Sequence, residues 1–215
     1  MHATDSPSEV PARKGPWGWI VLAVIAAGAL GYVVVATAPS RQPSGTQNPA
    51  VGRKVQFLRL QPLTGDAKTV LADDLQGHVS IVNYWGTWCG PCIREFPELV
   101  AMADELSAND SFRFYPVSCG SQGNDQDLDE LRDLTEQFLQ ARDASLATYA
   151  DQNADSRRRL ALLLGMDQFA YPTTMLVDRN GRIQGFWVGY NPAYVSEMRT
   201  LASQLLSRAE DEPAS

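Results

Sequence analysis

The sequence predicts an α/β domain built on a mixed β-sheet, and three observations lead to this prediction. Residues 79–85 form an apolar run typical of a buried strand, and residues 93–107 follow with helical spacing broken once by Pro97. A second apolar run at 112–118 then predicts a parallel strand, which completes a right-handed βαβ unit. Finally, residues 173–188 contain the turn Asn180-Gly181 between two apolar runs, which indicates an antiparallel hairpin.

The remaining elements follow from the same patterns. Alternating residues 55–60, the turn chemistry of Leu63-Thr64-Gly65-Asp66 and a short run at 68–71 predict an N-terminal β-hairpin. Three segments fill the region between the parallel strands and the C-terminal hairpin: a helix at 128–141, a weakly indicated strand at 145–150 and a helix at 155–164. An amphipathic helix at 192–207 closes the domain. The predicted order from residue 79 is β-α-β-α-β-α-β-β-α.

The most informative motif is Trp88-Cys89-Gly90-Pro91-Cys92, between the predicted strand and helix. Two cysteines at this spacing can close and reopen a small disulfide ring, and a helix N-terminus stabilises the thiolate of the first cysteine. That thiolate is the attacking species in thiol–disulfide exchange. The same spacing also occurs in zinc sites, but the chain has only His2 and His78 to complete one, and we expect no metal.

These residues closely resemble the thioredoxin superfamily, and specifically its membrane-anchored extracytoplasmic branch of TlpA-like and ResA-like thiol–disulfide oxidoreductases. The resemblance is carried by VNYWGTWCGPC at 82–92 and by YPTTMLVD at 171–178, and it spans residues 55–189. It implies a thioredoxin fold with an N-terminal β-hairpin extension and a central insertion. It also implies a redox-active dithiol as the reacting group, with no further cofactor.

The resemblance assigns roles to nine residues. Cys89 is the expected nucleophile and Cys92 the resolving thiol, while Glu95 and a cis Pro172 complete the catalytic set. Pro172 lacks an N–H, so the adjoining backbone of Tyr171 is free to pair with an extended substrate. The residues expected to contact substrate are Trp88, Gly90, Pro91, Tyr171 and Thr173.

Glu95 lies three residues after Cys92, on a neighbouring position of the predicted helix. The resembling family keeps a buried glutamate here, and a buried carboxyl group has a raised pKa and can exchange a proton with Cys92. The alternative is an exposed helix charge. Cytosolic thioredoxin instead carries an aspartate six residues before its first cysteine, a position that is Asn83 in this chain.

The N-terminal region predicts the compartment. Residues 16–38 include an uncharged apolar stretch long enough to cross a bilayer, and Arg13 and Lys14 before it favour a cytoplasmic N-terminus. A signal peptide cleaved after Ala36-Thr37-Ala38 is the competing interpretation, which the length of the apolar stretch and Pro39 oppose. The sequence thus predicts a disordered tail (1–15), a membrane anchor (16–38), a flexible linker (39–52), an extracytoplasmic domain (53–208) and a frayed tail (209–215). The resemblance implies the bacterial periplasm.

Composition limits the function further. The net charge of −7 argues against nucleic-acid binding, which needs a basic face. The third cysteine, Cys119, ends an apolar strand and is expected to behave as a buried hydrophobe, with a redox or metal role as the alternative. The consecutive Arg157, Arg158 and Arg159 are expected to form a solvated helix face.

The leading hypothesis is an anchored reductase of disulfides in exported proteins, re-reduced by a transmembrane thiol-reductase. The resemblance suggests an apocytochrome c or a copper-site protein as substrate, and the Gly-Pro dipeptide of thioredoxin favours a reducing potential. A disulfide oxidase or isomerase could use the same cysteines. A non-catalytic copper carrier would want a CxxxC pair and a distal histidine, and a peroxidase would want a lone peroxidatic cysteine; this chain has neither pattern.

Overall fold

The computed structural model of this protein describes residues 20, 23–25, 27–28, 44–121 and 125–210. The chain divides into two units, residues 1–42 and residues 43–215. In the first unit the described residues are helical, and nowhere in the described part of the chain is a helix long and apolar enough to span a bilayer. The predicted membrane helix at 16–38 lies mostly outside the described residues, and the predicted tail at 1–15 lies wholly outside them.

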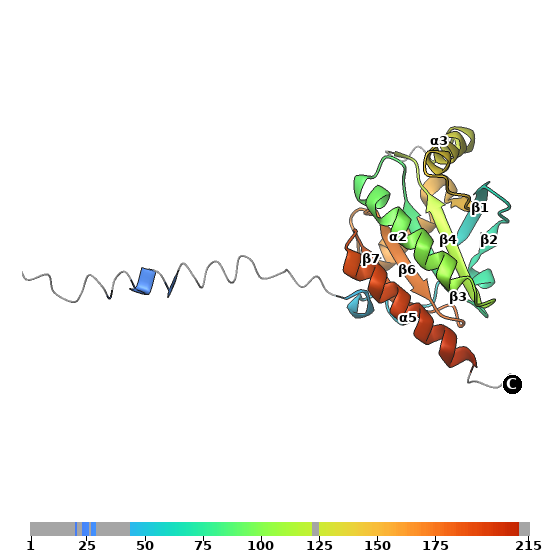
Figure 1. Ribbon diagram of the computed structural model, residues 1–215. Coiled ribbons are helices and arrows are strands. Elements are labelled where there is room, and N and C mark those ends of the chain that lie inside the picture. The colour runs from blue at the N-terminus through green and yellow to red at the C-terminus, as the bar shows by residue number, and fades with distance from the viewer. Residues whose placement is uncertain (1–19, 21–22, 26, 29–43, 122–124, 211–215) are drawn as a thin grey trace, which may run out of the picture. The chain divides into compact units, whose positions relative to one another are not determined.

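The second unit is built on one mixed sheet of seven strands in the order β2-β1-β5-β4-β3-β6-β7 (Figure 1). Strands β3, β4 and β5 are parallel, and the other neighbouring pairs are antiparallel. The strands are β1 (Arg59–Thr64), β2 (Val70–Leu71), β3 (Val79–Trp85), β4 (Phe112–Ser118), β5 (Thr148–Ala150), β6 (Thr173–Val177) and β7 (Ile183–Val188). All seven residues of β3 are buried, as expected for the centre of a sheet covered on both faces.

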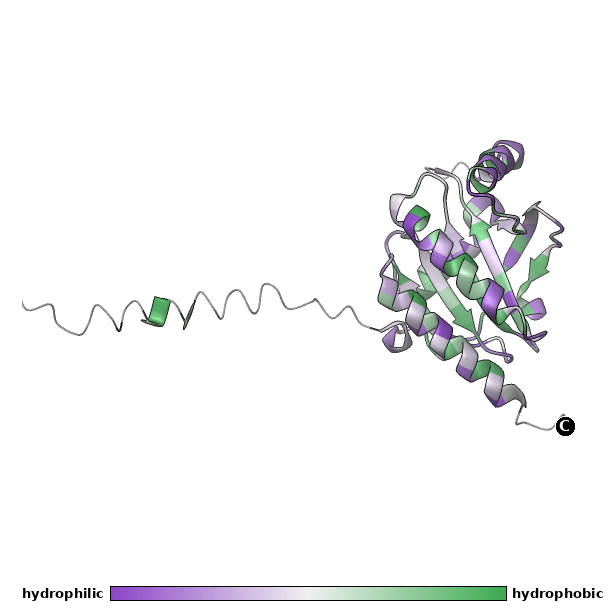
Figure 2. Cartoon of the chain, in the orientation of Figure 1, coloured by the Kyte–Doolittle hydropathy of each residue, from purple (hydrophilic) through white to green (hydrophobic). Residues whose placement is uncertain are grey.

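Helices cover both faces of this sheet. Helices α2 (Gly90–Leu106) and α5 (Pro192–Glu210) lie side by side on one face (Figure 1). Successive residues of β3 point to opposite faces: Ile81 packs under α2 and α5, whereas Tyr84 packs with Leu160 of α4 (Asp155–Leu164) on the other face. Figure 2 shows that the helices covering the sheet carry both polar and apolar residues.

A fourth helix, α3 (Leu128–Gln140), follows β4 and packs beside β1, where Leu131 meets Leu63 and Ala150. Three short 3-10 helices complete the described elements: η1 (Gly45–Gln47), η2 (Ala72–Leu75) and η4 (Gln152–Ala154).

The predicted α/β class, mixed sheet and element order are confirmed, but three local predictions are wrong. The strand of the N-terminal hairpin begins at Arg59 and continues through Leu63 and Thr64, which were expected to form the turn, because β1 pairs with β5 as well as with β2. Strand β5 keeps only the last three residues of the weakly indicated segment. Helix α2 is not broken at Pro97 but continues through it.

The predicted linker at 39–52 is wrong from residue 44 onward, because Ser44 to Gly52 pack on the domain. Ala50 is fully buried in the core, and Gly45 lies against the indole of Trp187 so closely that a Cβ atom there would sit 2.2 Å from the ring. Ser44 hydrogen-bonds the carboxylate of Glu197. The domain therefore starts before residue 53, and α5 ends at Glu210, beyond the predicted boundary of 208.

Candidate active site

The candidate site lies where β3 ends and β6 begins. These strands are antiparallel neighbours, and Tyr84 is paired with Thr173. The loop that leaves β3 carries Cys89, and the residues that enter β6 are Tyr171 and Pro172, so the register of one strand pair places both segments at the same edge of the sheet. The Tyr171–Pro172 peptide bond is cis, as the resemblance implied.

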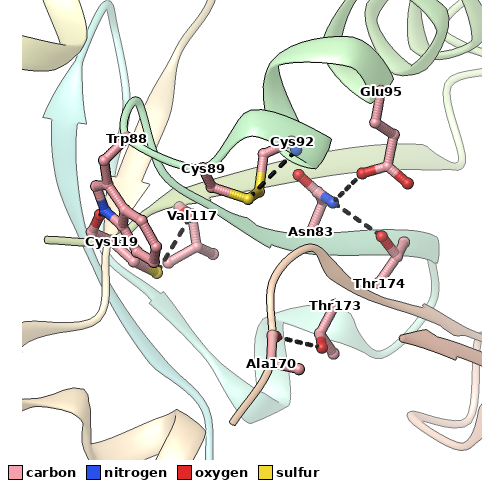
Figure 3. The surroundings of a disulfide bond; sticks show 10 residues. All are labelled: Asn83, Trp88, Cys89, Cys92, Glu95, Val117, Cys119, Ala170, Thr173 and Thr174. Carbon is pink, nitrogen blue, oxygen red and sulfur yellow. Dashed lines mark hydrogen bonds between the residues drawn. A yellow bond between two sulfur atoms is a disulfide. The ribbon is translucent and has the colours of Figure 1, made fainter. Parts of the chain in front are cut away.

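Cys89 is the N-cap residue of α2 and is joined to Cys92 by a disulfide bond (Figure 3). The backbone N–H of Cys92 donates to the sulfur of Cys89, 3.3 Å away. This N–H is one of the unpaired donors of the first helical turn. After reduction, the same donor and the positive end of the helix dipole favour the thiolate of Cys89.

Both cysteines are buried, with 5% of Cys89 and 2% of Cys92 exposed. They pack in an apolar cluster with Trp85, Phe96 and Phe138, and Tyr171 contacts the edge of this cluster. Trp85 is therefore a core residue, with 2% of its surface exposed. The exposed neighbours of the disulfide are Trp88, Gly90 and Pro91, which were predicted to contact substrate.

Glu95 is buried beneath the helix start, with 1% of its surface exposed, so it is not an exposed helix charge. Asn83 donates its side-chain amide to Oε2 of Glu95 at 3.3 Å and to the hydroxyl of Thr174 at 2.8 Å (Figure 3). Oε1 of Glu95 has no protein partner among the described residues. Burial raises the pKa of Glu95 to about 8, opposed by the Asn83 hydrogen bond and assisted by the nearby charge of Glu98.

Trp88 is held in place from two directions. Its indole N–H donates to the carbonyl oxygen of Cys119 at 2.9 Å, and its ring meets the ring of Tyr171 edge-on with 5.3 Å between centroids. This arrangement requires Gly86, where a Cβ atom would lie 2.5 Å from the indole nitrogen. Trp88 is nevertheless 47% exposed, so its outer surface is available beside Cys89.

Thr173 was expected to contact substrate, but its side chain is fully buried and its hydroxyl donates to the carbonyl oxygen of Ala170 at 2.8 Å. Cys119 is also buried, and burial is the main reason that its pKa is raised to about 12. The described residues hold no cluster of His, Cys, Asp or Glu able to bind a metal ion.

The prediction that residues 157–159 form a solvated arginine face is wrong for Arg157. This side chain is buried, with ion pairs to Asp125 and Asp151. Arg158 is exposed and pairs with Asp155, and Arg159 lies over the ring of Phe57. Helical geometry accounts for the difference, because consecutive residues point 100° apart and only Arg157 faces the sheet.

Comparison with known proteins assigns this architecture to a family. The model of the family described as AhpC/TSA matches residues 51–186. The chain belongs to the AhpC/TSA family. Among the solved structures, a DsbE-type thiol:disulfide interchange protein from Chlorobium tepidum is 26% identical with a TM-score of 0.52, covering 74% of this chain and 97% of that one. The predicted thioredoxin fold is thereby confirmed.

Curated relatives of this chain have a consistent set of names. DsbE of Pseudomonas aeruginosa is 26% identical over 78% of this chain and 84% of its own length. ResA of Bacillus cereus is 21% identical over 76% of this chain and 82% of its own length. A shorter match of 63 residues, 32% identical, covers 29% of this chain and 36% of HelX of Rhodobacter capsulatus. All three are named as thiol:disulfide interchange proteins or thiol–disulfide oxidoreductases, and this chain is a thiol–disulfide oxidoreductase of the same type.

Sequence reasoning missed two parts of the site. Asn83 was noted because cytosolic thioredoxin has an aspartate at this position, but its hydrogen bond to Glu95 was not predicted, because it depends on β3 and α2 bringing the two side chains together. The partners of Arg157 lie in the loop after β4 and at the end of β5, far away in the chain. The uncharged Asn83, in a chain expected to have a buried carboxyl group at Glu95, was a signal for the contact between them. Nothing in the local pattern indicated the partners of Arg157.

Proposed function

We propose that this protein reduces disulfide bonds in exported proteins, with Cys89 as nucleophile and Cys92 as resolving thiol. The observation that carries the proposal is the Cys89–Cys92 disulfide at the N-cap of α2, beside a cis-proline and one helical turn from a buried carboxyl group. Each component has a defined role in a two-step exchange.

In the first step, the Cys89 thiolate attacks one sulfur of the substrate disulfide. That S–S bond breaks, a mixed disulfide forms between Cys89 and the substrate, and the released substrate sulfur takes up a proton. In the second step, the Cys92 thiol loses its proton and attacks the sulfur of Cys89. The mixed disulfide breaks, the second substrate thiol is released, and the enzyme is left with the disulfide seen in the structure. Two electrons pass from the enzyme dithiol to the substrate.

Glu95 is suited to accept the proton of Cys92 in the second step. The two residues are one helical turn apart and both are buried. A pKa of about 8 leaves a useful fraction of the carboxyl group ionised near neutral pH and makes it a better base than a solvated glutamate. Oε1, which has no protein partner in the described part of the chain, is free to receive the proton.

Substrate docking is assigned to the segment before β6. No backbone hydrogen bond from Tyr171 is found among the described residues, and Pro172 has no N–H to donate. An extended substrate segment can therefore pair with Tyr171 as an added strand does. The exposed face of Trp88 and the exposed Gly90 and Pro91 complete the contact surface around the cysteines.

The N-terminal sequence and the bacterial relatives support a setting for this reaction. An anchor at residues 16–38 would place the domain in the periplasm, where disulfides persist. The substrates would be exported proteins such as an apocytochrome c or a copper-site protein, and a transmembrane thiol-reductase would supply the electrons. The dithiol would be the redox group, with no added cofactor.

A copper carrier on the same fold is less well supported. His78 precedes β3 and Cys89 follows it, so a strand of seven residues, about 20 Å long, separates them. An oxidase or isomerase remains the alternative, because both would use the same two cysteines. The oxidase would pass electrons in the opposite direction, and the isomerase would catalyse no net electron transfer.

The reduction potential of the Cys89–Cys92 pair tests the direction. The full-length chain is equilibrated in dithiothreitol buffers, and the dithiol fraction is measured by alkylation. We expect a potential nearer to thioredoxin, about −270 mV, than to the periplasmic oxidant at about −120 mV. A value at the oxidising end would contradict the reductase and favour a disulfide-forming enzyme.

A further inference from the structure

A buried cluster of three charges lies behind Tyr171. Nη2 of Arg157 is 2.6 Å from Oδ2 of Asp125, and Nε is 3.1 Å from Oδ2 of Asp151. All three residues are at most 3% exposed. Charges are tolerated at such depth only when they are paired and hydrogen-bonded, so the three side chains are fixed relative to one another.

The cluster joins three segments of the chain. Asp125 accepts the N–H of Gly120, just after β4. Asp151, just after β5, accepts the N–H groups of Ser156 and Arg157 at 2.9 Å each, which caps the start of α4. The turn between Asp151 and the start of α4 has a φ angle of 60° at Asn153 and of 56° at Ala154. Left-handed backbone at two non-glycine residues persists where the surroundings hold it, as this cluster does.

The remaining donor of Arg157 points at the active site. With Nε and Nη2 held by carboxylates, the planar guanidinium fixes the direction of Nη1, which donates to the hydroxyl of Tyr171. The ring of Tyr171 contacts the ring of Trp88 edge-on, and Trp88 is anchored by its indole N–H on Cys119. A continuous set of contacts therefore runs from two buried carboxylates to the surface beside Cys89.

We propose that Arg157 is a positioning residue for substrate docking, holding the Tyr171 side chain and with it the Tyr171–Pro172 backbone in register with Cys89. The inference rests on the proposed function in one respect, the use of the Tyr171 backbone to bind an extended polypeptide. The substrate class it favours is a disulfide within a peptide segment that pairs along this edge. A small disulfide has no such segment and gains nothing from the positioning.

The variant that tests this is Tyr171→Phe, which keeps the ring against Trp88 and removes the hydroxyl. Two probes are compared: a synthetic extended peptide with one internal Cys-x-x-Cys disulfide, and dithionitrobenzoate as a small disulfide. We expect the peptide KM to rise and the ratio of peptide to small-disulfide kcat/KM to fall about tenfold, the loss expected for one charge-assisted hydrogen bond.

A double-mutant cycle links this effect to Arg157. Arg157→Lys keeps the buried positive charge but loses the planar fork. If Arg157 acts through the Tyr171 hydroxyl, the double variant with Tyr171→Phe shows no larger fall in the ratio than Tyr171→Phe alone. Arg158→Gln, which alters the exposed neighbour paired with Asp155, is the control and should leave the ratio unchanged.

The outcomes separate this inference from the proposed function. An unchanged ratio in folded Tyr171→Phe, or additive effects in the double variant, would overturn the positioning role. Because exchange is reversible, the same peptide is assayed in two ways: the oxidised peptide with reduced enzyme, and the reduced peptide with oxidised enzyme. The kcat/KM for the peptide is then taken from the direction in which exchange occurs. The direction decides the reductase assignment, and the ratio decides the role of Arg157. No exchange in either direction would contradict both.

Discussion

Asn83 donates its side-chain amide to the buried carboxyl group of Glu95 at 3.3 Å. This hydrogen bond favours the ionised carboxylate, whereas burial opposes it and dominates, so the pKa of Glu95 is about 8. The contact joins the central strand β3 to helix α2 at the level of the dithiol. Asn83 therefore lowers the pKa of Glu95, the proposed proton acceptor.

We expect Asn83→Ala to move the pKa of Glu95 above its value of about 8, because it removes the interaction that lowers it. The pH at which Cys92 resolves a mixed disulfide at half its maximal rate should rise accordingly. Stopped-flow measurement of the second step between pH 6 and pH 10 would show this. In a Glu95→Gln background the same substitution should leave the pH profile unaffected, and a shift there would assign the inflection to another group.

Glu95→Gln should slow the second step about 10²-fold, because it removes the base that accepts the Cys92 proton. The inflection near pH 8 should disappear from the rate profile, and the mixed disulfide at Cys89 should accumulate, which mass spectrometry can detect. Glu105→Gln changes an exposed carboxylate on the same helix, paired with Arg199, and should have neither effect. An unchanged rate of mixed-disulfide resolution in Glu95→Gln would show that Glu95 is not the base that accepts the Cys92 proton.

Glu95 also makes stability depend on pH. Its folded-state pKa of about 8 lies above the unfolded value of 4.5, so the native state binds the proton more tightly. The free energy of unfolding should therefore be highest below about pH 4.5, as far as this group is concerned, and fall as pH rises from there to about 8, by up to ~5 kcal/mol for a shift of this size. Urea denaturation at pH 5.5 and pH 8.5 measures this fall in the free energy of unfolding. The fall should be smaller in Glu95→Gln than in the unaltered protein. Equal losses in both proteins would mean that the carboxyl group ionises without cost.

Local patterns were enough to predict most of the domain. Strands β3 and β4 and helix α4 have the residue ranges expected, because tertiary contacts do not override the apolar runs of the two strands or the helical character of residues 155–164. The predictions that failed depend on distant contacts. Residues 44–52 have the composition of a polar linker, but Gly45 packs against the ring of Trp187 and Ser44 hydrogen-bonds the carboxylate of Glu197. Arg157 has the sequence context of a solvated residue, but it is paired with Asp125 and Asp151.

At the candidate site, a motif and a resemblance were enough to single out Cys89, Cys92 and Pro172, and the structure places the Cys89–Cys92 disulfide and the cis Tyr171–Pro172 bond at the same edge of the sheet. The burial of Cys89 could not be predicted in this way, because Phe138 of α3 and Tyr171, which pack in the same cluster, are distant in the sequence.

Cys119 should be unreactive in the native protein, because burial is the main cause of its pKa of about 12 and a thiolate is the reactive form. Iodoacetamide at pH 8 should label the reduced native protein at Cys89 first and reach Cys119 only after unfolding. Cys119→Ala should leave the potential of the dithiol unchanged. Rapid labelling of native Cys119, or a disulfide between it and Cys89, would instead favour the redox alternative.

Gly86→Ala tests how Trp88 is held. A Cβ atom at this position would lie 2.5 Å from the indole nitrogen and 3.0 Å from the carbonyl oxygen of Cys119, so it must displace the ring and break the hydrogen bond between them. We expect a loss of about 1–3 kcal/mol in the free energy of unfolding, the usual cost of overpacking, together with a change in tryptophan fluorescence. Gly90→Ala is the matched comparison for stability, because a Cβ atom there would lie 3.9 Å from the end of the flexible Arg94 side chain, an ordinary van der Waals contact. Since Gly90 starts α2, alanine there should be neutral or slightly stabilising. Equal stability of the two variants would show that Trp88 moves aside without cost and that its hydrogen bond to Cys119 does not hold the substrate surface in place.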